Sequence, residues 1–150
     1  MLNEILITNI FTSGIDKTKD GNLTLNSEKL GALPGLVEED VLQITQVLPG
    51  VESINESVAD INIRSGSHDQ NLILWDGMKM YQSGHFFGLI SAFNPLITKN
   101  VIIIKDGTSA AYTDGVSGTI DMRSKDQLVD SIAGSITTTF LRRHYTTKRL

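Results

Sequence analysis

The chain has 150 residues, a formal net charge of −4 at pH 7, no cysteine and 40% hydrophobic residues. This length and composition suit one globular domain with a hydrophobic core. The acidic balance argues against nucleic acid or an anionic membrane as the main partner, because both require a basic face. The absence of cysteine excludes a disulfide framework and a thiolate metal site.

The first part of the chain predicts two short strands. The Ile- and Leu-rich stretch Glu4–Thr8 is typical of a strand, Asp20-Gly21 indicates a turn, and Asn22–Leu25 suits the strand after it. No run of about eighteen apolar residues occurs, so the sequence predicts no transmembrane helix.

An amphipathic helix is predicted over Leu36–Val47. Its apolar positions recur at helical spacing: Val37, Val41, Ile44 and Leu48. The acidic run Glu38–Asp40 falls in the predicted first turn, where the helix dipole favours anions. Pro49-Gly50 ends the predicted helix.

The second half of the chain predicts strands separated by turns. Ile61–Arg64 and Thr119–Arg123 alternate apolar and polar residues. Leu72–Trp75 and Val101–Ile104 are continuous apolar runs, typical of strands covered on both faces. Asp76-Gly77 directly follows the first of these runs and predicts a two-residue hairpin, because a type I′ turn needs positive φ at both central positions. The elements together indicate an α/β fold, a small mixed sheet of about four strands with one main helix and short helical turns.

The C-terminal part has a different pattern. Ile132–Leu141 alternates regularly, with small residues on both faces, and predicts a long strand. Asp126–Asp130 is the predicted linker before it.

Catalysis and metal binding are both disfavoured. His68-Asp69 and His85 could serve as a base with an orienting carboxylate, but they lie in polar loops and no nucleophile-elbow serine accompanies them. The 3 histidines include no pair at helical metal-ligand spacing. The glycine-rich stretch 107–118 lacks a phosphate-loop signature. We therefore expect no enzyme activity, no metal site and no cofactor.

A loop rich in aromatic residues follows the predicted hairpin. Aromatic residues on a loop favour ligand contact, and the residues predicted to bind a ligand are Tyr81, Gln82, His85 and Phe86. The alternative is that Phe86, Phe87 and Phe93 cap the sheet.

Two cations end predicted apolar strands. Arg64 and Lys105 must either lie at the rim in water or be paired with an acid. No acidic residue is an obvious local partner for both, so the partner could lie outside this chain.

Five short signatures follow one another in a fixed order. They are Leu48-Pro49-Gly50-Val51, Ile61–Gly66, Leu72–Gly77, Ile104–Tyr112 and Val116–Met122. In this order they resemble the plug domain of TonB-dependent outer-membrane receptors, over about residues 25–125. Trp75–Asn94 further resembles receptors of the Bacteroidetes type that are related to ferric-citrate transporters.

The sequence departs from the family pattern at several places. Ser65 stands where a glycine usually follows the arginine, and Ile102 and Asp106 replace a glutamate and a glycine. Thr113-Asp114 stands where a glycine usually follows the tyrosine. We interpret these departures as variation that is typical of one subfamily of plug domains.

The resemblance implies a role in transport. A plug sits inside its own C-terminal β-barrel in the outer membrane, on the periplasm-facing side, and the partner protein TonB pulls on its N-terminal segment. The resemblance places the loops Glu52–Asp60 and Tyr81–Phe93 toward the ligand, a small molecule such as a ferric siderophore or ferric citrate. It also implies that Arg64 and Lys105 pair with barrel carboxylates.

Three regions are expected along the chain. Residues 1–24 form an N-terminal strand and turn near the TonB-interacting segment, 25–126 the plug, and 127–150 a linker and first barrel strand that is disordered or edge-paired. Met1–Glu4 lacks the features of a signal peptide, so we expect a segment of a longer chain. The alternative is a periplasmic protein-interaction module without a transport role; an enzyme comes third.

Overall fold

The structure, a computed structural model, describes residues 13–27, 29, 40–55, 57–85, 87–88, 90–95, 97–105, 108–124, 134–135 and 146–147. Several predictions fall wholly or partly outside these residues: the strand Glu4–Thr8, positions 36–39 of the predicted helix, the ligand role of Phe86, the linker Asp126–Asp130 and most of the strand Ile132–Leu141. Within that last stretch, β11 (Gly134–Ser135) pairs antiparallel with β12 (Thr146–Thr147).

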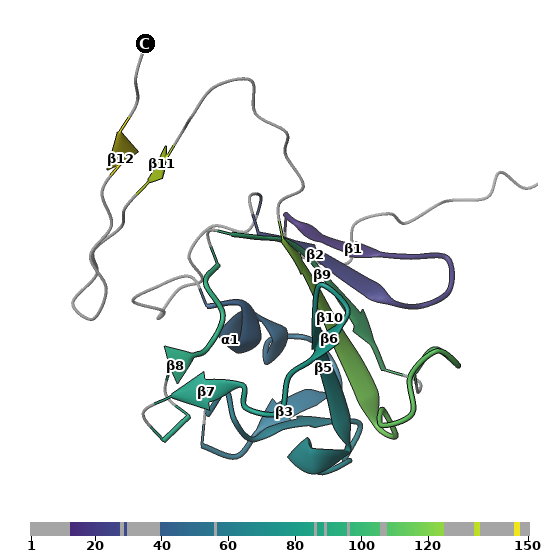
Figure 1. Cartoon of the computed structure of the whole chain (residues 1–150). Helices are drawn as coiled ribbons and strands as arrows, with labels where there is room; N and C mark the ends of the chain where they lie inside the picture. The colour runs from purple at the N-terminus through teal and green to yellow at the C-terminus, as the bar shows by residue number, and fades with distance from the viewer. Residues whose placement is uncertain are drawn as a thin grey trace, which may run out of the picture.

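A six-stranded mixed sheet forms the centre of the fold, in the order β1-β2-β9-β10-β5-β6 (Figure 1). The strands are β1 (Ile15–Lys17), β2 (Leu23–Asn26), β5 (Asn71–Trp75), β6 (Met78–Lys79), β9 (Thr98–Ile104) and β10 (Gly118–Ser124). Only β10 and β5 run parallel; the other pairs are antiparallel. The mixed sheet is confirmed, but the predicted count of about four strands was too low, because β1 and β6 are too short to show alternation.

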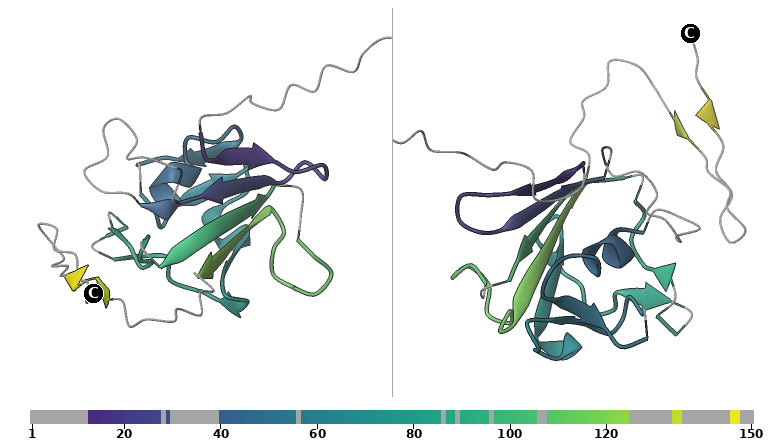
Figure 2. Two further views of the ribbon diagram at one scale, coloured as in Figure 1. Left: turned by 90° about the horizontal axis from the view of Figure 1, so that it is seen from above. Right: turned by 180° about the vertical axis from the view of Figure 1, so that it is seen from behind.

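Smaller elements lie on one side of this sheet. They are α1 (Val41–Thr45), the pair β3 (Val51–Ser53) and β4 (Ile61–Ile63), the 3-10 turn η1 (His68–Gln70), and the pair β7 (Gly84–His85) and β8 (Ile90–Ser91). Figures 1 and 2 view the molecule from different directions, and both show α1 and β3 on the same face of the sheet.

The helix is shorter than predicted. Asp40 has an extended backbone and is the N-cap, so α1 begins at Val41 and ends at Thr45. The first turn of α1 holds no acidic residue, and Gln46 and Val47, which were predicted to be helical, follow its end; residues 36–39 of the predicted helix lie outside the described residues. Periodicity marks which face is apolar, whereas the cap decides where the helix starts.

The core lies between the sheet and these smaller elements. Buried side chains of β9 and β10, such as Ile103 and Ile120, pack with Leu42 of α1 and Ile63 of β4. The opposite face of the sheet is also partly covered, because Leu72 and Leu74 are buried but do not belong to this cluster. The segment 108–117 approaches that face, since a Cβ atom on Gly115 would lie 2.9 Å from Thr119 Oγ1.

The hairpin between β5 and β6 has the predicted geometry. Asp76 and Gly77 have φ values of 47° and 81°, as a two-residue turn of the predicted type requires. Among the residues that the structure describes, no helix is long and apolar enough to cross a membrane.

Candidate functional site

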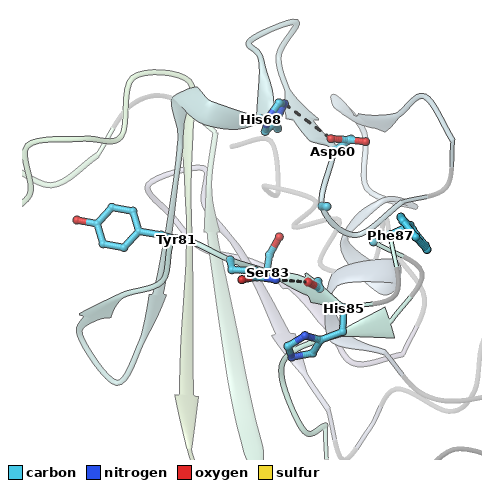
Figure 3. Close-up of a pocket in the computed structure, with 10 residues that line it drawn as sticks. Asp60, His68, Tyr81, Ser83, His85 and Phe87 are labelled. Carbon is cyan, nitrogen blue, oxygen red and sulfur yellow. Dashed lines mark hydrogen bonds and ion pairs between the residues drawn. The ribbon is translucent and has the colours of Figure 1, made fainter.

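Loops from three parts of the chain enclose a surface hollow of about 450 Å³ (Figure 3). We call it the loop hollow, and its lining comes from 59–60, His68 and the described residues of 81–88. Three of the predicted ligand residues, Tyr81, Gln82 and His85, lie in this lining. The structure therefore brings them together; their role in binding stays a prediction.

The aromatic residues of this region divide between the surface and the core. Tyr81 is 92% exposed and Phe87 is 100% exposed, and their rings project from opposite sides of the hollow (Figure 3). Phe93 is only 1% exposed and stacks on Trp75 with ring centroids 5.1 Å apart. The sheet-capping alternative thus describes Phe93 but not Phe87.

Phe87 also lines the hollow, although the sequence did not indicate it as a ligand residue. Its backbone conformation is unusual. Its φ of 56° is rare for a bulky residue, and such strain tends to persist where the surroundings impose it. The neighbouring Gly88 packs so closely on the 52–60 loop that a Cβ atom there would lie 2.1 Å from Ser57 Oγ. The 81–88 loop therefore turns tightly at Phe87-Gly88, where it packs on the 52–60 loop, and the Phe87 ring points outward.

Hydrogen bonds tie the two predicted ligand loops together. The Val58 backbone N–H donates to the Gly88 carbonyl at 2.7 Å. The Ser83 hydroxyl donates to the Val58 carbonyl at 3.1 Å. The loops around 52–60 and 81–88 consequently form one unit.

Asp40 connects this unit to the helix. One carboxylate oxygen, Oδ1, accepts the backbone N–H groups of Leu42 at 2.8 Å and Gln43 at 3.1 Å, capping α1. The other, Oδ2, accepts the N–H of Ser91 in β8 at 3.1 Å. A displacement of β8 would therefore act on the first turn of α1.

Two acidic residues lie in or beside the loop hollow, Asp60 in its lining and Asp69 next to His68. His68 Nδ1 lies 3.9 Å from Asp60 Oδ1, and both side chains are about half exposed (Figure 3). A hydrogen bond from the Ser67 hydroxyl, then one from its own backbone and the nearby His68, lower the pKa of Asp69. Within the described part of the chain, no group of three or more His, Asp or Glu side chains could hold a metal ion.

The two predicted cations lie near each other and near a third. Lys105 Nζ donates to the Pro49 carbonyl at 2.8 Å. Burial lowers the pKa of Lys105, and the positive charges of Arg64 and Lys17 lower it further. The sequence did not indicate that Lys17 lies beside these cations, because only the pairing of β1 with β2 and of β2 with β9 brings it to this end of the sheet.

A second carboxylate holds the end of β10. Asp76 accepts the backbone N–H of Ser124 at 2.8 Å and its hydroxyl at 2.7 Å. These bonds, the hydroxyl first, lower the pKa of Asp76. Lys79 of the same hairpin forms an ion pair with Asp114 in the 108–117 segment. The hairpin thus fixes both the end of β10 and the loop before it.

Comparison with known proteins identifies the family. Residues 24–120 match the family described as the TonB-dependent Receptor Plug Domain. This match covers more than half of the chain, which therefore belongs to the family of TonB-dependent receptor plug domains. No curated protein matches the chain.

Solved structures that share this fold are receptors with much longer chains. The siderophore receptor PirA from Pseudomonas aeruginosa is 21% identical with a TM-score of 0.57, covering 80% of this chain and 21% of that one. A mutant ferric enterobactin receptor, PfeA, from the same organism is 21% identical with a TM-score of 0.53, covering 70% and 17%. PirA from Acinetobacter baumannii is 19% identical with a TM-score of 0.53, covering 77% and 18%. The chain thus spans about a fifth of the length of these receptors.

Proposed function

We propose that this chain is the gate and ligand-sensing part of a TonB-dependent outer-membrane transporter for active nutrient uptake. Membership of the plug family supports this role. The observation that carries the ligand-sensing part is the loop hollow, in which two hydrogen-bonded loops present exposed Tyr81 beside Gln82 and His85. The alternative of a periplasmic interaction module without transport has no comparable support.

The proposed mechanism needs no bond chemistry. The chain sits inside its own C-terminal barrel and faces the periplasm on one side. Ligand binding at the loop hollow displaces β8, and the Asp40 bridge transmits this displacement to α1. TonB then pulls the N-terminal segment and opens a path. The partner supplies the energy, so the chain requires no catalytic residue.

The proposed cargo is a small organic ligand of the siderophore class, because the similar structures include siderophore and ferric enterobactin receptors. The resemblance of Trp75–Asn94 adds ferric citrate as a candidate. Both are proposals, because the chain shares only the fold with those receptors.

Ligand binding by the intact receptor tests the proposal. We expect Tyr81→Ala to weaken binding about tenfold, because an exposed aromatic anchor contributes about 1 to 2 kcal/mol at an interface. His85→Ala should weaken it less. The matched control is Tyr112→Ala, since Tyr112 does not line the hollow. Unchanged affinity of both hollow variants for every ferric siderophore that the cells take up would refute the ligand-sensing role.

A further inference from the structure

The charges around the loop hollow indicate which ligands it accepts, an inference that rests on the proposed function. A second hollow of about 300 Å³ shares Ala59, His68, Tyr81 and Ser83 with the first. The carboxylates in these linings are Asp60 and Asp69. Among the described residues, neither lining contains a lysine or an arginine.

The sequence of the two loops extends this charge pattern. Residues 52–60 carry the acids Glu52, Glu56 and Asp60, and residues 81–93 carry no acid. Neither stretch contains a lysine or an arginine. A third hollow beside the first adds Glu52 to the acidic lining. A polyanion that approached these loops would meet several negative charges and no lysine or arginine.

The hydrogen-bonding groups of the lining also favour one class of ligand, one that carries hydrogen-bond donors. The Ser83 hydroxyl and one N–H of Gln82 already bond the carbonyls of Val58 at 3.1 Å and Gly84 at 3.2 Å. The carboxylates of Asp60 and Asp69 accept hydrogen bonds, so a ligand that brings N–H groups can bond them.

The exposed aromatic rings of the lining also disfavour an anionic ligand. Tyr81 and Phe87 flank acidic groups with aromatic faces. An aromatic face attracts a cation and also accepts an apolar carbon chain. It offers an anion no electrostatic attraction, because the ring face is the negative part of its quadrupole.

We propose that this plug selects ferric chelates that are neutral or positively charged and carry N–H donors, such as trihydroxamates with a free ammonium group. Polyanionic chelates, including ferric citrate and tris-catecholates, bind poorly at the same loops. The sorting arises because the loop hollow and the second hollow present the carboxylates of Asp60 and Asp69 beside the aromatic rings of Tyr81 and Phe87, with no lysine or arginine in either lining.

Three gallium-loaded chelates of different charge test this selection on the whole chain. They are the cationic trihydroxamate ferrioxamine B, the neutral trihydroxamate ferrichrome and the anionic tris-catecholate of enterobactin. Gallium replaces iron at the same charge and is diamagnetic, so amide NMR shifts report where each chelate binds. We expect the cationic and the neutral chelate to shift the amide signals of Tyr81–His85. Added salt should weaken the binding of the cationic chelate only.

Removing one carboxylate separates charge from shape. Asp60→Asn should weaken the cationic chelate about fivefold, as expected for one exposed charge contact, and leave the neutral chelate unchanged. Asp114→Asn is the matched control, because Asp114 is similarly exposed, pairs with Lys79 and lies outside the hollows.

The outcomes are distinguishable. Tighter binding of the anionic chelate at these amides would overturn the charge class and leave the ligand-sensing role intact. No shift of these amides with any of the three chelates would overturn both. An equal effect of Asp60→Asn on the cationic and neutral chelates would also refute selection by charge.

Discussion

At the scale of single residues, Asp76 serves two purposes. Its positive φ forms the turn between β5 and β6, and its carboxylate accepts two hydrogen bonds from Ser124 at the end of β10. The sequence predicts the first purpose, because Asp-Gly is a local signal. The second depends on the parallel pairing of β10 with β5, which brings Ser124 to the turn.

The pKa shift of Asp76 gives stability a pH dependence. Its pKa lies below the ordinary value of 3.8 in the folded chain, so the unfolded chain binds the proton more readily. The stabilisation is therefore present above pH 3.8 and is lost as the pH falls through the lower folded value.

Ser124→Ala should remove the part of this pH-dependent contribution that comes from the hydroxyl. We expect a loss of about 0.5 to 1 kcal/mol in the free energy of unfolding at neutral pH, modest because the pair is exposed. The loss should be smaller at an acid pH below 3.8, because protonation of Asp76 weakens the hydrogen bonds that it accepts. Urea unfolding at the two pH values measures it. Ser117→Ala is the control, because Ser117 bonds the neutral Gln70 side chain. An equal loss at both pH values would contradict the assignment.

At the scale of elements, α1 depends on its surroundings. A helix of 5 residues is too short to be stable alone, so its cap and its packing must hold it. Leu42 and Ile44 bury its apolar face, and Asp40 caps its start while also accepting from Ser91. The helix and β8 are consequently coupled through one carboxylate.

Asp40→Asn separates the cap from the coupling. An asparagine oxygen still caps the helix, but its amide nitrogen cannot accept the Ser91 N–H. We expect the Ser91 amide to exchange with solvent about tenfold faster, as for the loss of about 1.4 kcal/mol of local protection. The Leu42 and Gln43 amides, measured in the same exchange experiment, should keep their rates. Faster exchange at all three would show instead that the helix itself had loosened.

At the scale of the whole molecule, three cations gather at one end of the sheet. Lys17, Arg64 and Lys105 come from β1, the end of β4 and the end of β9. Their mutual repulsion and the burial of Lys105 both disfavour its charged form, as its lowered pKa reflects. Within the described residues, no carboxylate forms an ion pair with Lys105. Acids on a surrounding wall would relieve this repulsion, which agrees with the proposed barrel.

One substitution should therefore act differently in the chain and in the receptor. Lys105→Gln, which keeps a donor for the Pro49 carbonyl, should barely change the melting temperature of the isolated chain. In the intact receptor it should loosen the plug, because breaking a buried ion pair costs about 3 to 5 kcal/mol. Thermal melting of the chain and protease sensitivity of the plug in the receptor measure the two effects. A large loss of stability in the chain alone would exclude pairing with the barrel.

The sequence by itself determined features that depend on neighbouring residues. The strands around Ile61, Leu72 and Val101 and the Asp76-Gly77 turn follow from apolar periodicity and backbone preference, and the structure confirms them. The ordered motifs were sufficient to indicate the plug family, which the comparison confirms.

Only the tertiary structure decided features that depend on residues far apart in the chain. The start of α1, the exposure of Phe87 and the presence of Lys17 beside Lys105 each follow from contacts between distant segments. The short strand β1 likewise exists because β2 offers it a hydrogen-bonding edge. Periodicity records which residues prefer burial, whereas the packed fold decides what each one is buried against or turned away from.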